Sequence, residues 1–368
     1  MSTVVRTGPG RPRADSVRSP ALRHLAPNWY STVMGTAVVA TAGAALPVPG
    51  AGPALAAVWA AAAVLLVLVA AARAAHWLRH RDQARAHLLD PAVAPFYGCL
   101  PMALLAVGTA GLGAGRELIG EPAAVALAFA LFTAGTAGAV TVAVGVPYLM
   151  VVRHRIAPGS ASPVWLLPVV APMVAAASGP PLAPYLPAGP GREALLLLCG
   201  ALFGMSLLAT LLMLPLFFAR LVHEGPLPLA TTPALFLVLG PLGQSTTALS
   251  NAAAVSSDAP YGSALTVLSV GYGVPVMGFA LLWLALAGAM TVRALRLGMP
   301  FSLGWWAFTF PVGTCVTGLA GLADRTGLAA FSVPAAALYG LLVTAWAVAG
   351  WRTVRGAAGG ALFAAPRR

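Results

Sequence analysis

The polar residues that could handle a solute are concentrated in one apolar part of the chain. The stretch from Gly240 to Asn251 carries Gln244, Ser245 and the threonines at positions 246 and 247 within an otherwise apolar segment. Amide and hydroxyl groups are costly in lipid unless they meet a polar partner or water. The stretch therefore fits two roles equally well, namely the lining of a solute path and hydrogen bonding between helices.

A second informative stretch combines aromatic residues with a proline. Residues 305–311 read Trp-Trp-Ala-Phe-Thr-Phe-Pro. Two adjacent tryptophans at the start of a helix are typical of anchors at the membrane surface. Phe310 lies next to Pro311, which is expected to bend the helix. A phenyl ring there could project into a path and close it, although spacing alone favours a packing role.

The types of residue that are missing from the apolar segments exclude several classes of function. No Asp, Glu, Arg or His lies in the middle of an apolar segment. This argues against a pump with a carboxylate in the membrane, an intramembrane protease or an Asp-rich prenyl-transferring enzyme. A neutral path lined by hydroxyls and backbone dipoles, with arginines at its mouth, suits anions better than cations.

No metal site or cofactor is expected. His76 and His80 are one helical turn apart but have no third ligand, so they are interpreted as solvated residues beside the membrane. Cys99, Cys199 and Cys315 lie in separate apolar segments and suggest neither a disulfide framework nor a metal site. No enzymatic activity is expected, and an intramembrane enzyme is kept only as a remote alternative.

The elements that must position these residues are transmembrane helices. Of the 368 residues, 59% are hydrophobic and 8% are charged, whereas a soluble domain carries roughly 25% charged residues. A membrane-spanning helix needs about 20 apolar residues. Ten apolar segments are found, at residues 28–46, 53–75, 96–115, 122–151, 163–183, 193–221, 229–255, 261–292, 301–322 and 328–351. The fold class is therefore an all-α membrane protein of ten transmembrane helices.

The arginines set the expected orientation. All 21 basic residues are Arg, and all but Arg116, Arg192 and Arg325 fall on one side of the predicted helices. Basic residues favour the cytoplasmic side, so both termini are expected there. Residues 1–26 are predicted to be a disordered cytoplasmic arm, 27–352 the transmembrane domain and 353–368 a cytoplasmic tail. Arginine without lysine, together with abundant Ala, Gly and Pro, suggests a high-GC genome and hence a bacterial plasma membrane.

The odd-numbered segments differ from the even-numbered ones. They are richer in Gly, Ser and Thr and contain most of the prolines expected to kink a helix, although Pro147, Pro215 and Pro275 are in even segments. Kinked helices are tolerated in membranes where neighbours or water satisfy the freed carbonyls. The odd helices are therefore predicted to form an inner ring. Ordinary packing through small residues explains the same composition and stays open.

Five motifs on the odd segments resemble those of one transporter family. Residues 26–36 read Ala-Pro-Asn-Trp-Tyr-Ser-Thr-Val-Met-Gly-Thr, with Tyr30 where phenylalanine is common in the family. The other four are Pro95-Phe96 with Pro101-Met102, Trp165–Pro172, Gly240–Ser245 and Trp305–Pro311. In this order they resemble the tellurite-resistance/C4-dicarboxylate transporter family, the superfamily of slow-type, voltage-dependent anion channels. It includes plant slow anion channels, fungal malate transporters and sulfite efflux pumps.

The resemblance implies an architecture and a site. It implies five helical hairpins with quasi-fivefold symmetry, odd helices around a central pore in each protomer, and assembly as a homotrimer. The family's aromatic gate on the ninth helix corresponds to Phe310. The candidate pore-lining residues are Thr32, Thr36, Pro101, Pro168, Pro172, Pro241, Gln244, Ser245, Thr309, Pro311 and Thr314.

Two transport hypotheses follow. The first is a channel or uniporter-like carrier for small inorganic or carboxylate anions, with lipid and a small anion as its partners. The second is an exporter of sulfite or of a C4-dicarboxylate such as malate, coupled to protons. Tellurite resistance would name a phenotype and not a substrate.

Overall fold

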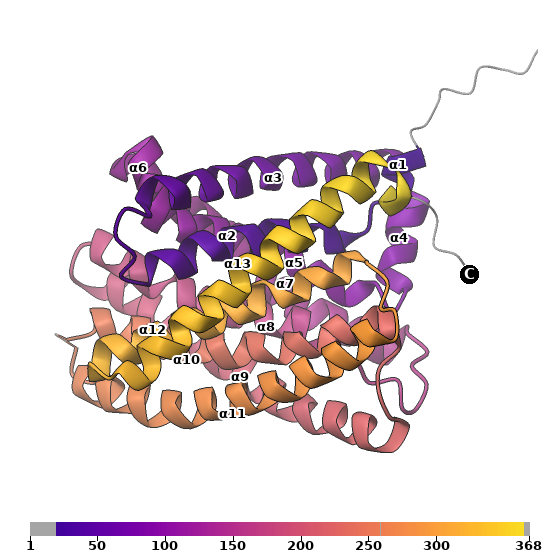
Figure 1. The fold of residues 1–368 in the computed structure, drawn as a ribbon. Coiled ribbons are helices and arrows are strands. Elements are labelled where there is room, and N and C mark those ends of the chain that lie inside the picture. Colours follow the sequence, from indigo (N-terminus) through magenta and orange to yellow (C-terminus); the bar gives the residue numbers. More distant parts are fainter. Residues whose placement is uncertain (1–19, 258, 364–368) are drawn as a thin grey trace, which may run out of the picture.

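The computed structural model describes residues 20–257 and 259–363, and every regular element within these ranges is helical (Figure 1). Each of the ten apolar segments is helical to within a few residues of its expected ends. The expected arm at residues 1–19 and the last five residues of the tail, 364–368, lie outside the described residues.

Five helical units are mostly buried and are called the inner helices. Each enters an α-helix through a 3-10 turn. They are η1–α2 (Pro27–Trp29 and Tyr30–Ala44), η2–α5 (Ala94–Gly98 and Cys99–Ala110), η4–α8 (Pro163–Trp165 and Leu166–Ser178), η6–α10 (Leu229–Val238 and Leu239–Val255) and η7–α12 (Leu303–Phe308 and Phe310–Thr326). Along the cycle α2, α5, α8, α10 and α12, each inner helix contacts the next, and α12 contacts α2 again.

Five longer helices cover this cycle and are called the outer helices. They are α3 (Gly52–Arg79), α7 (Glu121–Val152), α9 (Pro190–Glu224), α11 (Gly262–Arg296) and α13 (Ala329–Ala358). Each packs across two adjacent inner helices, as α3 does on α2 and α5. Many of their leucine and valine side chains are exposed on the outside of the bundle, as expected where lipid is the solvent.

Within the described residues, eight helices are long and apolar enough to cross a membrane. The units η1–α2 and η6–α10 are not among them, because polar residues such as Thr32, Thr36, Gln244 and Asn251 lower their hydropathy. Both units are covered by other helices. A helix that faces protein on all sides can carry more polar residues than one that faces lipid.

Most of the prolines that were expected to kink the inner helices lie at helix starts instead. Pro101, Pro168 and Pro241 occupy the first turn of α5, α8 and α10, and Pro311 is at the start of α12. A proline in the first turn removes an N–H that has no partner in the helix anyway. The fifth candidate proline, Pro172, differs because it lies inside its helix, α8. These prolines therefore mark the change from 3-10 turn to α-helix.

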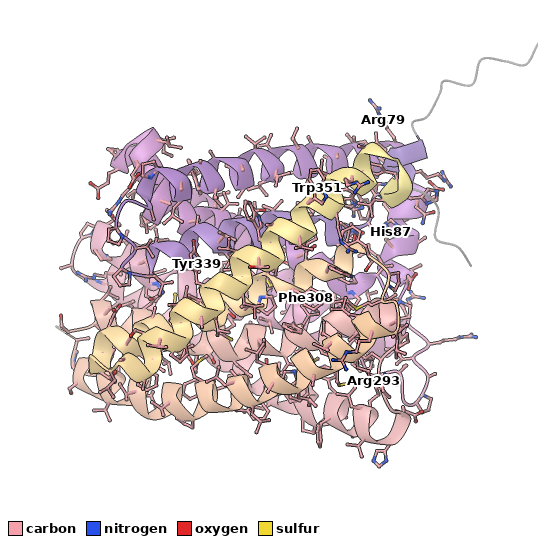
Figure 2. All side chains as sticks on the ribbon, in the orientation of Figure 1. Arg79, His87, Arg293, Phe308, Tyr339 and Trp351 are labelled. Atoms are coloured by element: carbon pink, nitrogen blue, oxygen red, sulfur yellow. The ribbon has the colours of Figure 1, made fainter. Side chains whose placement is uncertain are left out.

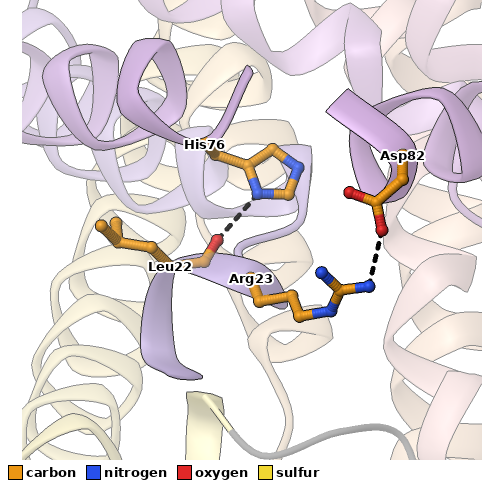
Figure 3. A network of polar contacts seen from close by, with 4 residues as sticks. All are labelled: Leu22, Arg23, His76 and Asp82. Carbon is orange, nitrogen blue, oxygen red and sulfur yellow. Dashed lines mark hydrogen bonds and ion pairs between the residues drawn. The ribbon is translucent and has the colours of Figure 1, made fainter. Parts of the chain in front are cut away.

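The start of the described chain folds onto the ends of α3 and α4 (Arg81–Leu89). Residues 20–23 form α1, although this part of the arm was expected to be disordered. His76 Nδ1 lies 2.7 Å from the carbonyl oxygen of Leu22, and Arg23 pairs with Asp82 at 2.6 Å (Figure 3). Arg73 donates to the carbonyl of Leu25. These contacts hold the segment against the bundle.

The interpretation of His76 and His80 as solvated residues is wrong. Their side chains are 0% and 2% exposed, because α4 turns back along the end of α3 and covers them. His76 stacks on His87 of α4 with ring centroids 5.3 Å apart. Trp305 and Trp306 are likewise buried and are not anchors on the surface. In both cases the neighbouring segment that covers the side chain could not be placed from local sequence.

The contact of α4 with α3 should weaken in acid. Burial, and then the positive charge of Arg73, lower the pKa of His87 from its ordinary 6.5 to about 4. Between these values the unfolded chain binds a proton that the folded chain does not, so stability falls as pH falls from 6.5 towards 4. We expect His87→Gln to flatten the pH dependence of thermal unfolding in this window. His223→Gln, at an exposed site on α9, should leave the dependence as it is in the wild type.

Candidate functional site

Two cavities lie inside the cycle of inner helices, one at each end. Among the described residues, Phe310 is the only one that lines both. Its side chain is 4% exposed, and the residue is the first of α12. The preceding residue, Thr309, donates a hydrogen bond from its hydroxyl to the carbonyl of Trp306 at 2.6 Å. The ring therefore lies where the two cavities meet.

The first cavity, called the N-terminal cavity, has a volume of about 190 Å³. The first turns of all five inner helices line it, through residues such as Asn28, Phe96, Val164, Ala230 and Leu303. Its lining is mostly apolar. Helix N-termini carry unpaired N–H groups and the positive end of the helix dipole. Five of them converging on one space produce a potential that favours negative charge without any charged side chain.

The second cavity, called the C-terminal cavity, has a volume of about 180 Å³ and lies on the other side of Phe310. All five inner helices contribute to it as well. Its lining is richer in polar groups, which are Thr41, Thr109, Ser178, Gln244, Thr247, Asn251, Thr314, Thr317 and Asp324. A small hydrophilic solute could exchange water for these groups here.

The hydroxyl hydrogens of this lining have acceptors within the protein. Ser178 donates to the carbonyl of Val174 at 2.8 Å, and Thr317 donates to that of Thr314 at 3.0 Å. The Thr247 hydroxyl donates to the carbonyl of Gly243 at 3.0 Å and also lies within hydrogen-bond distance of Thr317 Oγ1, at 2.8 Å. These hydroxyls thus present mainly oxygen lone pairs to the cavity.

Gln244 differs from its neighbours in the C-terminal cavity. Its side chain is 8% exposed, and no hydrogen-bond partner for its amide is found among the described residues. By contrast, Asn251 Nδ2 donates to the carbonyl of Ala177 at 2.8 Å. A nearly buried amide without a protein partner needs water or a solute. The Gln244 N–H₂ group is therefore available to donate to an anion in this cavity.

The structure brings only some of the candidate pore-lining residues to the two cavities. Gln244, Thr314 and Pro311 line a cavity. Ser245 turns towards α11, where it accepts a hydrogen bond from Tyr272 at 2.9 Å. Thr36 accepts from Trp346 of α13 at 3.1 Å and, with Thr32, lines an apolar groove between α3 and α13. The remaining candidates, which line neither cavity, are Pro101, Pro168, Pro172, Pro241 and Thr309.

Sequence reasoning missed several lining residues of the C-terminal cavity. Thr109 and Ser178 are single hydroxyls in apolar helices and bond to each other at 2.9 Å. Asp324 was assigned to a loop, whereas α12 continues to Thr326 and ends at Gly327 with φ +67°. A Gly directly after the last turn is a common helix end, and Gly327 could have shown that the helix extends past Asp324.

The described residues contain no group of three or more His, Cys, Asp or Glu side chains that could hold a metal ion. The three cysteines are free and buried on different helices. The polar groups of the site are therefore hydroxyls, amides, backbone dipoles and one carboxylate.

The two ends of the bundle differ in charge. The end with α1, α4 and the C-terminus of α13 carries most of the described arginines, among them Arg79 and Arg293 (Figure 2). The N-terminal cavity lies at this end, since the inner helices start where the outer helices stop. Three described arginines, Arg116, Arg192 and Arg325, lie towards the opposite end.

Comparisons with known proteins identify the family of the chain. The chain is 28% identical to a sulfite efflux pump of Trichophyton rubrum over 308 residues, which cover 81% of each chain. It is 25% identical to an uncharacterized transporter of Methanocaldococcus jannaschii over 300 residues, covering 80% of this chain and 82% of that one. These relatives are fungal and archaeal, so they lend no support to the expected bacterial source. The profile of the voltage-dependent anion channel family matches residues 24–354, and the chain belongs to that family.

Proposed function

We propose that this protein carries small anions across a membrane along the axis of its inner helices, with Phe310 closing the path. The observation that carries this proposal is that two cavities from opposite ends of the bundle meet at one buried aromatic ring. Hydrophobic constrictions of this kind can stop ions by excluding water. Membership of an anion channel family supports the class of solute.

The electrostatics of the path favour anions over cations. Five helix N-termini surround the N-terminal cavity, and arginines crowd the same end. Fixed positive potential at a mouth raises the local concentration of anions and their rate of entry. Neither cavity has a lining Arg, so an anion would be attracted without being held tightly. Conduction needs such weak binding.

The proposal includes ten membrane crossings arranged as five hairpins. In this arrangement η1–α2 and η6–α10 cross with the other eight, and each pair of an inner and an outer helix repeats around a quasi-fivefold axis. The closed cycle of inner contacts supports it. The excess of arginine at the end where the described residues begin and finish supports a cytoplasmic location for this end. We also expect a homotrimer, which the mass of the detergent-solubilised protein would test.

The substrates that we propose to test first are sulfite, malate and inorganic anions such as chloride. Sulfite comes first because several relatives are named sulfite efflux pumps. Flux of each anion into proteoliposomes, with and without an imposed proton gradient, separates the hypotheses. A channel moves anions without a proton gradient, whereas the alternative, a coupled exporter, moves one substrate together with protons.

The amide of Gln244 should contribute to flux. Replacing Gln244 by Leu keeps a side chain of similar size and removes the free donor. A hydrogen bond to a charged group contributes about 1.5–3 kcal/mol, so we expect anion flux to fall by at least about tenfold. Gln83→Leu makes the same change on α4, away from both cavities. Equal flux in Gln244→Leu and the wild type would remove Gln244 from the path.

A further inference from the structure

One carboxylate lies in the proposed path of a negatively charged solute. Among the described residues, Asp324 is the only side chain lining either cavity that is charged at neutral pH. It belongs to the last turn of α12 and is exposed at the C-terminal cavity. Replacing Asp324 by a neutral residue should change the stability of the fold little, because its side chain makes no hydrogen bond or ion pair among the described residues.

Asp324 forms no ion pair with its neighbours among the described residues. The adjacent Arg325 turns to α10, where Nη2 donates to the carbonyl of Ser250 at 3.0 Å. Arg192 of α9 likewise donates to a backbone carbonyl, that of Val255 at 3.3 Å. The C-terminal end of a helix adds partial negative charge of its own. Asp324 and the end of α12 therefore present negative charge directly to the cavity, whereas the guanidinium groups of Arg325 and Arg192 do not line it.

The rest of the lining offers little compensation for a second negative charge on the solute. The hydroxyl hydrogens of Ser178, Thr247 and Thr317 have acceptors in the protein. The amide of Gln244 is a free donor, and no arginine or lysine lines the cavity. Doubly charged oxyanions in proteins generally rely on cationic or multiple charge-assisted donors. A singly charged oxyanion needs fewer.

We propose that Asp324 sets the charge selectivity of the path and makes it favour singly charged oxyanions over doubly charged ones. This inference rests on the proposed anion path and specifies its class of substrate. Two unit charges about 4 Å apart in water repel by about 1 kcal/mol, which is about a fivefold effect for each added charge. For an acid with two ionisable protons, the transported species is then the monoanion.

The test compares sulfate, which is divalent at neutral pH, with nitrate, which is monovalent. Fluxes of both are measured in proteoliposomes at low ionic strength, for the full chain and for its Phe310→Ala form. Asp324→Asn keeps the size of the side chain and removes its charge. We expect the sulfate-to-nitrate flux ratio to rise by about fivefold, and the rise to shrink in high salt because the site is exposed.

Glu193→Gln is the matched control. Glu193 lies in the first turn of α9 at the same end of the bundle but lines neither cavity, so its variant should keep the wild-type ratio. An unchanged ratio in Asp324→Asn, with nitrate still moving, overturns this inference and leaves the anion path standing. An equal rise in Glu193→Gln also overturns it, because surface charge in general would then be the cause. If no anion moves in any form, the proposed function fails, and this inference fails with it.

Discussion

Replacing Phe310 by Ala should open the protein to anions and raise their flux at least about tenfold, since each 1.4 kcal/mol removed from a barrier gives a factor of ten. The ring lines both cavities, and no other described residue does. Truncation to a methyl group joins spaces of about 190 and 180 Å³ into one. Currents across planar bilayers that contain purified protein would measure the change.

The control for this experiment is an aromatic residue two positions away. Phe308, which is labelled in Figure 2, lines neither cavity. It packs edge-to-face on Phe236 with ring centroids 4.8 Å apart. Phe308→Ala removes the same number of atoms and should leave the current at its wild-type level. Loss of a buried phenyl group commonly costs about 3–5 kcal/mol of stability, so folding of both variants is checked by thermal unfolding. If both variants conducted alike, or neither exceeded the wild type, Phe310 would not be the gate.

The second large effect should follow from adding one methyl group between α10 and α12. A Cβ atom on Gly243 would lie 2.5 Å from the backbone nitrogen of Cys315 and from Thr314 Oγ1. Backbone cannot move aside as a flexible side chain can, so the two helices would have to separate. Overpacking in a well-packed core costs about 1–3 kcal/mol, and occasionally more. For Gly243→Ala we expect a loss at or above about 3 kcal/mol, seen as a lower unfolding temperature in detergent.

Gly240, one turn earlier on α10, provides the comparison. A Cβ atom there would have nothing within 4 Å, and alanine favours helix over glycine by about 1 kcal/mol. Gly240→Ala should therefore unfold at the wild-type temperature or slightly above it. Similar unfolding temperatures for the two alanine variants would mean that the close contact of α10 with α12 is not required for stability.

Much of the fold could be predicted because lipid imposes a simple rule on the sequence. The outer helices face an apolar solvent and must be long and apolar, so α7 and α9 stand out in any hydropathy profile. The inner helices were identified by their small residues and prolines. Their starts were predicted less well. Pro101 and Pro241 were interpreted as kinks, whereas the chain uses them to begin α-helix after a 3-10 turn.

The site was harder to predict because it depends on how each inner helix is rotated. Gln244 and Ser245 are neighbours with similar chemistry, and successive residues on a helix point about 100° apart. The sequence does not show which of them faces the axis. Packing decides this, since Tyr272 of α11 takes Ser245 as its hydrogen-bond partner. Thr36 is directed outward in the same way by Trp346.

Long-range contacts explain the remaining surprises. His76 and His80 were expected to be in solvent, yet residues 22–25 and α4 bury them. Asp324 falls after the apolar segment expected to end at residue 322, whereas it belongs to the last turn of α12. These features depend on segments that are distant in the chain, about which local composition carries no information.

The sidedness of chemical labelling tests the central claim most directly. In a form without native cysteines, Ser31→Cys reports on the N-terminal cavity and Thr317→Cys on the C-terminal cavity. A small, negatively charged thiol reagent that cannot cross the membrane should reach Ser31→Cys only from the arginine-rich side and Thr317→Cys only from the other side. Adding Phe310→Ala should make both positions reactive from either side. If Phe310→Ala leaves the sidedness as it was, or if either position resists labelling from both sides, the two cavities are not parts of one path closed at Phe310.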